Sequence, residues 1–226
     1  MMLAVDRLPH GYSNFTRLVG GHVEKTYDGP LRRGNATREL ACLTALTGHL
    51  PVATVIHHDL SVPRLTLNVV PGSHGQDLLD AGHASQVLRL VGCTLAALHE
   101  VPLGTVRGLD GEGSVIVHGD FGPQNMLFDL EADCVTGVLD WESAHFGNPI
   151  EDLAWTEWIV RMHHHDAIDA LDELFAAAAQ RPVWSERHRA MIRQVRSVLA
   201  YCESVRMDPA AGEWRDRLRC TNAWTE

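Results

Sequence analysis

A chain of 226 residues is long enough to bury a substantial core, and it accommodates two small lobes around a cleft. Its 19 basic residues stand against 29 acidic ones, a formal net charge of -10, which argues against a nucleic-acid-binding face and suits a cationic small molecule better. The 5 cysteines form no CxxC pair, and no apolar stretch reaches the length of a signal sequence or a membrane span, so a cytoplasmic protein without a membrane partner is expected.

The first part of the chain, to about Gly72, predicts a small sheet that carries one helix. Gly20-Gly21 lies between two strand-like segments and is a hairpin signal. Asn35 is predicted to cap the helix, which runs through Leu46. We expect strands at residues 15–19, 22–27, 52–56 and 65–70, in a sheet of five strands.

From about His83 onward, apolar residues recur at the spacing of amphipathic helices. Short strands are expected between the first of these helices and the others. The predicted helices cover residues 83–98, 150–160, 167–179 and 185–205, with one more around Trp214 and Leu218, and the short strands cover 115–117, 126–128 and 135–139. The expected fold class is therefore α+β.

The basic residues comprise 18 arginines and a single lysine, Lys25. A position that keeps lysine in such a chain indicates a requirement for a compact ammonium group, which a planar guanidinium does not replace. The alternative is that this lysine was retained without a functional reason.

The segment His118-Gly119-Asp120 opens a match to the pattern H-x-D-x-x-x-x-N, which ends at Asn125, and Asp140 follows fifteen residues later. Phosphoryl transfer requires these residue types. One carboxylate orients the acceptor hydroxyl and takes its proton, while an amide oxygen and a second carboxylate hold Mg²⁺ against the phosphates. Taken alone, Asp120 is equally typical of a turn or a helix cap, so the prediction depends on the whole pattern.

The stretch VHGDFGPQNMLFD…VTGVLDWESAHFGNPIEDLAW, from Val117 to Trp155, resembles the signature of the aminoglycoside phosphotransferase family, whose relatives are choline kinases and, more distantly, protein kinases. The resemblance implies a bilobal protein kinase-like fold. Residues 1–72 would form a nucleotide-binding lobe with an antiparallel sheet and one helix, and residues 73–226 a helical lobe with the catalytic loop and acceptor site.

The resemblance also assigns roles to the motif residues. It implies that Asp120 is the catalytic base and that Asn125 and Asp140 are the magnesium ligands. By the same resemblance, Asp152 is the buried acid that supports the catalytic loop, together with His118.

The nucleotide, ATP or GTP, would bind to the first lobe. The resemblance implies that Lys25 holds the α- and β-phosphates, and Val23 shares its face of the strand. Glu39 is placed to pair with Lys25, although an ordinary solvated helix glutamate is the alternative. The implied nucleotide-binding residues are Ser13, Asn14, Val23, Lys25, Glu39, Asn68 and Val70, with the last two in a hinge whose backbone binds the base.

The acceptor site is the least defined part of the prediction. Candidates for binding an amine-bearing acceptor are Glu142, Glu157 and Glu203. The implied activity is transfer of the γ-phosphate to a hydroxyl of a cationic small molecule such as an aminoglycoside-like antibiotic, with a role in antibiotic resistance. Alternatives are a metabolic kinase acting on choline, homoserine or a sugar, and a catalytically silent nucleotide-binding module. The oligomeric state is not indicated.

Two further sequence features each allow two interpretations. His163-His164-His165 resembles a metal-binding run, but consecutive helical residues point in different directions, so a solvated helix end is favoured. Trp155 and Trp158 are spaced to line a substrate pocket, but aromatic residues at this spacing are more typical of a core.

Overall fold

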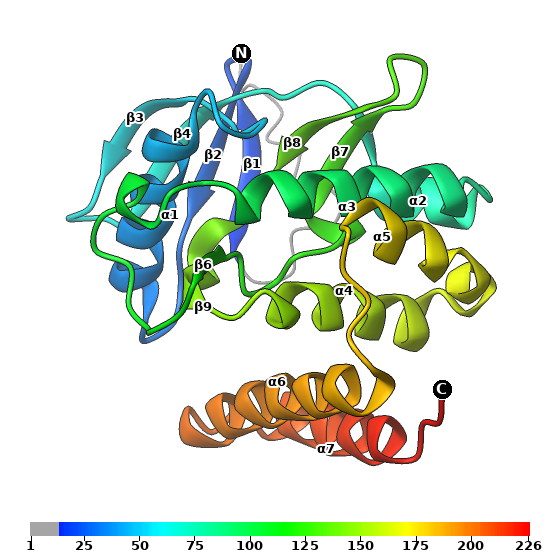
Figure 1. Ribbon diagram of the computed structural model, residues 1–226. Helices are drawn as coiled ribbons and strands as arrows, with labels where there is room; N and C mark the ends of the chain where they lie inside the picture. Colours follow the sequence, from blue (N-terminus) through cyan, green and yellow to red (C-terminus); the bar gives the residue numbers. More distant parts are fainter. Residues whose placement is uncertain (1–13) are drawn as a thin grey trace.

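The structure is a computed structural model that describes residues 14–226, so Ser13, predicted to bind the nucleotide, lies outside the described residues. Figure 1 shows a sheet with helix α1 (Arg32–Leu46) on one side of the molecule and most of the helices on the other. Helices α6 (Trp184–Ser204) and α7 (Asp208–Asn222) run side by side as a hairpin at the bottom of this view. The α+β prediction is confirmed.

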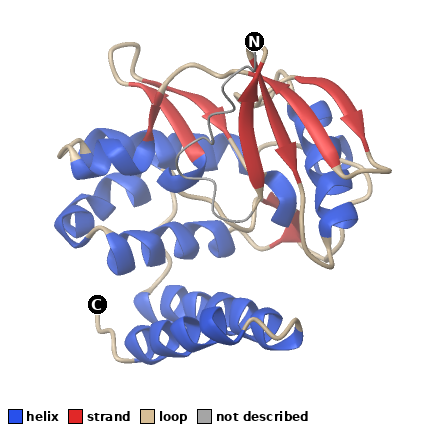
Figure 2. Cartoon of the chain, turned by 180° about the vertical axis from the view of Figure 1, so that it is seen from behind, coloured by secondary structure: helices blue, strands red, loops and turns tan. Residues whose placement is uncertain are grey.

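Within residues 14–226, the larger sheet consists of four antiparallel strands in the order β1-β2-β4-β3. The strands are β1 (Phe15–Val19), β2 (His22–Thr26), β3 (Val55–Asp59) and β4 (Arg64–Asn68). Figure 2 shows these strands standing beside α1. Lys25 lies on β2, opposite Thr16 on one side and Leu65 on the other, so neighbouring strands fix its position on both sides.

The remaining described residues form two small antiparallel sheets and most of the helices. One sheet has the order β5-β7-β8, and the other pairs β6 with β9. Their strands are β5 (Ser73–His74), β7 (Met126–Asp129), β8 (Cys134–Val138), β6 (Val115–Val117) and β9 (His145–Gly147). The helices are α2 (Gly75–Asp80), α3 (Ala84–His99), α4 (Ile150–His163) and α5 (Leu171–Ala177), followed by α6 and α7.

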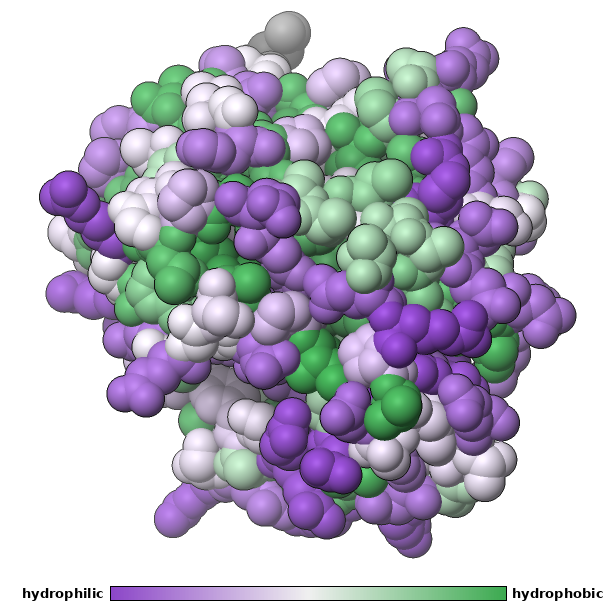
Figure 3. Space-filling view, in the orientation of Figure 1, coloured by the Kyte–Doolittle hydropathy of each residue, from purple (hydrophilic) through white to green (hydrophobic). Residues whose placement is uncertain are grey.

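Apolar packing falls into a main core and a smaller one. The main core joins the larger sheet and α1 to α3, α5 and the β7–β8 hairpin. The smaller core lies between α4, α6 and α7 and contains Trp155, Trp158, Met191 and Val195. Hydrophilic residues cover most of the α6–α7 hairpin on the face seen in Figure 3. Among the described residues, no helix is both long and apolar enough to cross a membrane.

Several predicted element boundaries were wrong. Helix α1 begins at Arg32, because the amide of Asn35 already donates to the carbonyl of Leu31, so Asn35 lies within the first turn and is not its cap. The strand expected from residue 52 begins at Val55, since Val52 instead forms an isolated bridge with Val138. The described part of the larger sheet has four strands where five were expected.

The helix expected at 167–179 is also interrupted. Residues 165–170 form a 3-10 helix, and α5 begins only at Leu171. The three histidines straddle the end of α4, where the helix stops at His163 and the backbone turns at His164. They therefore do not present their rings on one helical face.

Candidate active site

A cavity of about 650 Å³ lies between the larger sheet and the β7–β8 hairpin. Its walls are apolar toward β4 and polar toward the end of β8, where Lys25, Asn125 and Asp140 gather. A volume of several hundred cubic ångströms with one apolar and one charged end suits a nucleotide. All the described residues predicted to bind nucleotide line this cavity, namely Asn14, Val23, Lys25, Glu39, Asn68 and Val70.

The ammonium of Lys25 is the centre of a buried ion-pair network. Its Nζ donates to Glu39 Oε2 at 2.6 Å and to Asp140 Oδ1 at 2.8 Å. Tyr27 donates its hydroxyl to the same Glu39 oxygen at 2.6 Å. Burial disfavours the charged form of Lys25, but the negative charges of Asp140 and Glu39 outweigh it and raise its pKa above the ordinary value. The lysine is therefore a fixed positive charge at the polar end of the cavity.

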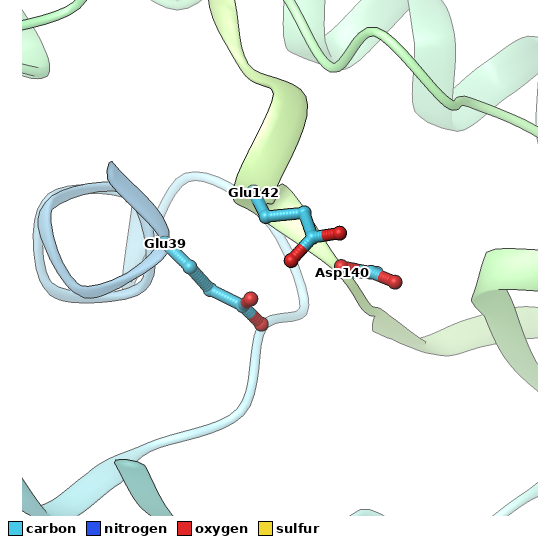
Figure 4. A group of neighbouring side chains, drawn as sticks. All are labelled: Glu39, Asp140 and Glu142. Atoms are coloured by element: carbon cyan, nitrogen blue, oxygen red, sulfur yellow. The ribbon is translucent and has the colours of Figure 1, made fainter. Parts of the chain in front are cut away.

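Glu142 joins Glu39 and Asp140 in a compact group of carboxylates. Figure 4 shows the three side chains converging from α1 and from the segment after β8, and one oxygen from each lies within 4.8 Å of the others. Glu142 Oε2 accepts a hydrogen bond from Asn14 Nδ2 at 2.7 Å. Burial and the charge of Asp140 raise the pKa of Glu142 to about 7. This group is partly neutralised by Lys25, and its hard oxygen atoms suit Mg²⁺.

Asp140 owes its position to an unusual backbone conformation. It follows β8 directly, with φ 62 and ψ 60, in the left-handed region that is uncommon for residues other than glycine. Such conformations persist where the surrounding structure holds them, and they cluster at functional sites. The turn directs the carboxylate to Lys25 at the wall of the cavity, which Asn125 also lines.

Asp152, at the start of α4, fixes the backbone of the loop that contains Asp120. Its carboxylate accepts hydrogen bonds from the amide of His118 at 2.7 Å and from the amide of Gly119 at 2.9 Å. Gly119 has φ +85, and a Cβ there would lie 2.6 Å from the carbonyl oxygen of Ser143, so the loop requires glycine. Burial raises the pKa of Asp152 to about 7, while these two amide donors act in the opposite direction.

His118 is a buried neutral imidazole that ties the loop to the end of β8. Its Nε2 lies 2.8 Å from the carbonyl of Leu139, and its Nδ1 accepts from the amide of Asp120 at 3.2 Å. Burial lowers the pKa of His118 to about 4, which agrees with Nε2 carrying the proton and Nδ1 remaining an acceptor. The loop before Asp120 is therefore hydrogen-bonded to both α4 and β8.

The carboxylate of Asp120 receives donors on both oxygen atoms. Asn125 Nδ2 donates to Oδ2 at 2.8 Å, and Gln124 Nε2 donates to Oδ1 at 3.2 Å. Trp155 Nε1 donates to Oδ1 at 2.7 Å. Burial raises the pKa of Asp120 to about 6, and the hydrogen bonds from Trp155, Asn125 and Gln124 limit that rise.

Asn125 meets the requirements for a magnesium ligand beside Asp140. Its amide nitrogen is occupied by the carbonyl and carboxylate oxygens of Asp120, at 2.8 Å each, which leaves its oxygen as the atom available to the cavity that it lines. An amide oxygen and a carboxylate form the hard donor set that Mg²⁺ prefers. The residues present therefore fit this ion.

The structure does not bring the acceptor candidates together. Glu157 has no exposed surface and pairs with Arg187 at 2.7 Å and with Arg161 at 2.9 Å, so it belongs to the core between α4 and α6. Glu203 lies on the surface and pairs with Arg215 at 2.7 Å. Glu142, beside Asp140, is the candidate that reaches the active-site cleft.

Gln124 was not predicted as an active-site residue, and Trp155 was given a substrate pocket only as the alternative to a place in the core. Trp155 packs in the core, as expected, but its indole nitrogen also contacts Asp120. One signal was present in the sequence: Trp155 follows Asp152 by three residues, so both side chains lie on the face of α4 that contacts the loop. His163 packs edge-on against Trp158, with ring centroids 5.7 Å apart, which does not resemble a metal ligand.

Comparison with known proteins supports the sequence resemblance. Residues 111–191 match the model of the APH family, described as the phosphotransferase enzyme family. A segment of 46 residues is 41% identical to the probable acyl-CoA dehydrogenase IBR3 of Arabidopsis thaliana, covering 20% of this chain and 6% of that protein. Another, of 39 residues, is 49% identical to acyl-CoA dehydrogenase family member 11 of Rattus norvegicus, covering 17% of this chain and 5% of that protein. The matches thus span only a small fraction of these relatives.

Solved structures match over nearly the whole chain. The GDP and kanamycin complex of APH(2")-IIia has a TM-score of 0.77 at 15% identity, covering 99% of this chain and 94% of that one. The macrolide 2'-phosphotransferase MphH from Brachybacterium faecium has a TM-score of 0.65 at 17% identity, covering 99% and 93%. Residues 111–191 are therefore similar to the phosphotransferase enzyme family, and the chain as a whole has the fold of the aminoglycoside phosphotransferases.

Proposed function

We propose that this protein is a small-molecule kinase that transfers the γ-phosphate of ATP or GTP to a hydroxyl group. The observation that carries this proposal is the convergence of Lys25, Asn125 and Asp140 at the polar end of one cavity, with Asp120 hydrogen-bonded to Asn125. These are the groups that phosphoryl transfer requires, and they come from β2, the catalytic loop and the end of β8.

The nucleotide lies in the cavity with its base against the apolar wall and its phosphates toward Lys25. Val23, Leu67 and Val70 supply apolar surface for the base, and the backbone around residues 68–70 offers hydrogen-bonding groups to its edge. Lys25, held by Glu39, contacts the α- and β-phosphates. The division into a nucleotide-binding lobe at 1–72 and a helical lobe at 73–226 fits this placement, because β5 at Ser73–His74 already pairs with β7.

Asn125 and Asp140 are the residues that would hold Mg²⁺, which when bound neutralises charge on the phosphates. Lys25 donates to Oδ1 of Asp140, so Oδ2 is the carboxylate oxygen that this contact leaves for the ion.

Asp120 acts as the base. Its Oδ1 accepts from two donors and its Oδ2 from one, so a lone pair remains at Oδ2 for the acceptor hydroxyl. The hydroxyl oxygen forms the new bond to the γ-phosphorus, the bond to the nucleoside diphosphate breaks, and Asp120 takes the hydroxyl proton. Asp152 and His118 hold the loop so that this carboxylate keeps its position.

A cationic acceptor such as an aminoglycoside-like antibiotic is the first candidate, with antibiotic resistance as the corresponding role. Support comes from the net charge of -10 and from a structural neighbour whose complex contains kanamycin. Glu142 is the carboxylate placed to meet an amine near the cleft.

A metabolic kinase with an uncharged or anionic acceptor is the second candidate, and a specific observation favours it. Residues 184–222, which form the α6–α7 hairpin, contain eight arginines and five acidic residues, in contrast to the acidic chain as a whole. Glu203 and Glu157 are already paired with arginine. Two relatives are named as acyl-CoA dehydrogenases, so a hydroxylated acyl-CoA is a suitable anionic test compound.

Mass spectrometry of a compound panel tests this proposal. The panel contains kanamycin, choline, homoserine, sugars and a hydroxylated acyl-CoA, incubated with ATP or GTP and Mg²⁺, and the Asp120→Ala variant is the control. A phosphate adduct that forms only with the intact protein supports the proposal and names the acceptor class. If Asp120→Ala modifies the same compound equally well, the base is wrongly assigned. If the nucleotide binds but is neither transferred nor hydrolysed, the silent-module alternative is favoured.

A further inference from the structure

The hydrogen bond from Trp155 to Asp120 differs in origin from the others on this carboxylate. Gln124 and Asn125 belong to the same loop as Asp120, within the 3-10 turn Pro123–Asn125. They move with the loop and cannot fix it relative to the rest of the molecule. Among the described residues, Trp155 is the donor to the Asp120 carboxylate that comes from a separate element, α4.

Helix α4 contacts the loop at successive positions. Asp152 accepts from the amides of His118 and Gly119, Trp155 donates to the side chain of Asp120, and Thr156 Oγ1 donates to the carbonyl of Phe121 at 2.9 Å. Asp152 fixes the backbone before Asp120, and Thr156 fixes it after Asp120. Trp155 fixes the reacting side chain itself.

The indole of Trp155 is itself firmly held. It is 5% exposed and stacks on Trp158, with ring centroids 4.4 Å apart and planes inclined by 2°. Trp158 in turn donates its Nε1 to the buried hydroxyl of Thr221 on α7 at 2.8 Å. Trp214, also on α7, stacks against both rings, at 6.3 Å from Trp155 and 5.6 Å from Trp158. The donor to Asp120 is thus anchored by the smaller core.

We propose that Trp155 is a positioning residue for the base: its indole N–H holds Oδ1 of Asp120 so that Oδ2 faces the acceptor hydroxyl. This inference rests on the proposed kinase function. A carboxylate held at one oxygen from outside its own loop cannot turn about its last side-chain torsion, and a small loss of alignment in a reacting group costs a large factor in rate. Without Trp155, Oδ1 retains only the 3.2 Å contact with Gln124.

The test compares Trp155→Phe with Trp158→Phe. The first keeps an aromatic ring in the stack but removes the donor to Asp120, and the second removes an equally buried indole donor that contacts Thr221. Transfer to the acceptor found by the panel is measured, or nucleotide hydrolysis if no panel compound is modified. We expect kcat of Trp155→Phe to fall by about 10- to 100-fold with nucleotide KM unchanged, and kcat of Trp158→Phe to stay within about 3-fold of the wild type.

A second readout does not depend on turnover. In ¹⁵N–¹H spectra, the indole resonance missing from Trp155→Phe belongs to Trp155, and it should shift in Asp120→Ala while the Trp158 resonance does not. An unshifted Trp155 resonance, a normal kcat in Trp155→Phe, or an equal loss in Trp158→Phe overturns the inference. These results are separable from failure of the proposed function, which is indicated if Asp120→Ala itself retains normal turnover.

Discussion

The two sides of Asp120 are built on different principles. On the side proposed to bind the nucleotide, called the nucleotide side below, Lys25, Glu39 and Asp140 come from three elements and line a cavity. On the side of the α6–α7 hairpin, charged groups such as Glu157 and Arg187 are paired with each other, and aromatic rings contact the loop. In the proposed kinase reaction, phosphate chemistry requires the residue types found on the first side. The second side depends on the acceptor, and its residue types carry no comparable constraint.

The largest effect should come from the group that lies between the two sides. Asp120→Asn keeps the shape of the side chain but cannot accept the hydroxyl proton, and we expect kcat to fall by about 1,000-fold, within the range of general-base catalysis. Steady-state transfer measures kcat, and calorimetric titration should show unchanged nucleotide affinity. A loss of affinity comparable to the loss of kcat would mean that Asp120 serves the nucleotide side instead.

Substitutions on the side of the α6–α7 hairpin should lower the stability of the protein and leave kcat unchanged. Arg187→Met leaves Glu157 buried without its main partner, and breaking such a pair costs about 3–5 kcal/mol. The melting temperature should fall by about 10 °C, while kcat measured well below the transition stays normal.

The double variant Glu157→Leu, Arg187→Met is the matched control for this pair. It removes both buried charges, so we expect it to recover at least about half of the lost stability. If kcat falls in Arg187→Met at a temperature where the protein is folded, the hairpin contributes to catalysis, and the proposed contrast between the two sides of Asp120 is wrong.

On the nucleotide side, the identity of the cation should matter as well as its charge. Lys25→Arg keeps the positive charge, but a planar guanidinium does not fit the space where one ammonium contacts both Glu39 and Asp140. We expect kcat/KM to fall by about 10- to 100-fold. Arg17→Lys, which changes a partly exposed cation on β1, is the control and should have little effect. Normal activity in Lys25→Arg would mean that the single lysine has no special role.

Asp152 provides a pH-dependent test of the loop support. The pKa of Asp152 is about 7 in the folded protein and about 4 for an ordinary aspartate. Between pH 4 and pH 7 the folded state therefore binds more protons than the unfolded state, and the stability that protonation of Asp152 contributes decreases as pH rises. Asp152→Asn cannot titrate. The stability of the variant relative to the wild type should therefore improve by about 2–3 kcal/mol between pH 5 and pH 8, measured by thermal unfolding.

Glu151 is the control for this titration because its pKa is shifted in the opposite direction. The hydrogen bond with His145 lowers the pKa of Glu151, so its stabilising contribution is present at neutral pH and is lost on acidification. Below about pH 5, where an ordinary glutamate titrates, Glu151→Gln should therefore become relatively less stable as pH rises, whereas Asp152→Asn should become relatively more stable above about pH 4. The same trend in both variants would contradict the assigned directions.

The smallest effect is expected at an exposed pair on the hairpin. Glu203→Gln removes the contact with Arg215, and such surface pairs contribute about 0–1 kcal/mol. The acceptor KM should not change, because this carboxylate is already paired on the surface. A tenfold rise in KM for a cationic acceptor would instead place Glu203 in the acceptor site. The charged groups on the hairpin side would then bind substrate and not only pair with each other.

The elements of this fold were predictable where local signals agree with tertiary packing. The strand at 115–117 is fully buried and was found by its short apolar run, and the hairpin of β1 and β2 was found by Gly20-Gly21. Asn35 failed as a cap because an asparagine can cap only where the backbone leaves the helix, and the helix had already begun one turn earlier. Tertiary contacts set that point, and local sequence does not report them.

For the site, the sequence was informative about residue types and uninformative about orientation. The pattern around Asp120 named Asn125 and Asp140, since their spacing is specific. It did not predict the contact of Trp155 with Asp120, because that contact depends on how α4 is rotated against the loop. It also offered Glu157 as an acceptor contact, since burial and pairing with Arg187 are not visible in a list of carboxylates.

The single lysine of this chain makes its chemistry unusually easy to follow with amine-directed reagents. Lys25 is 7% exposed and both of its strong contacts are carboxylates, so acylating reagents should react slowly with it in the folded protein. Apart from the α-amino group, no other amine competes, and a protease specific for lysine has one place to cut. Because labelling is slow only while these contacts hold, its rate at that one position reports how often the cleft around Lys25 opens, without any engineered probe.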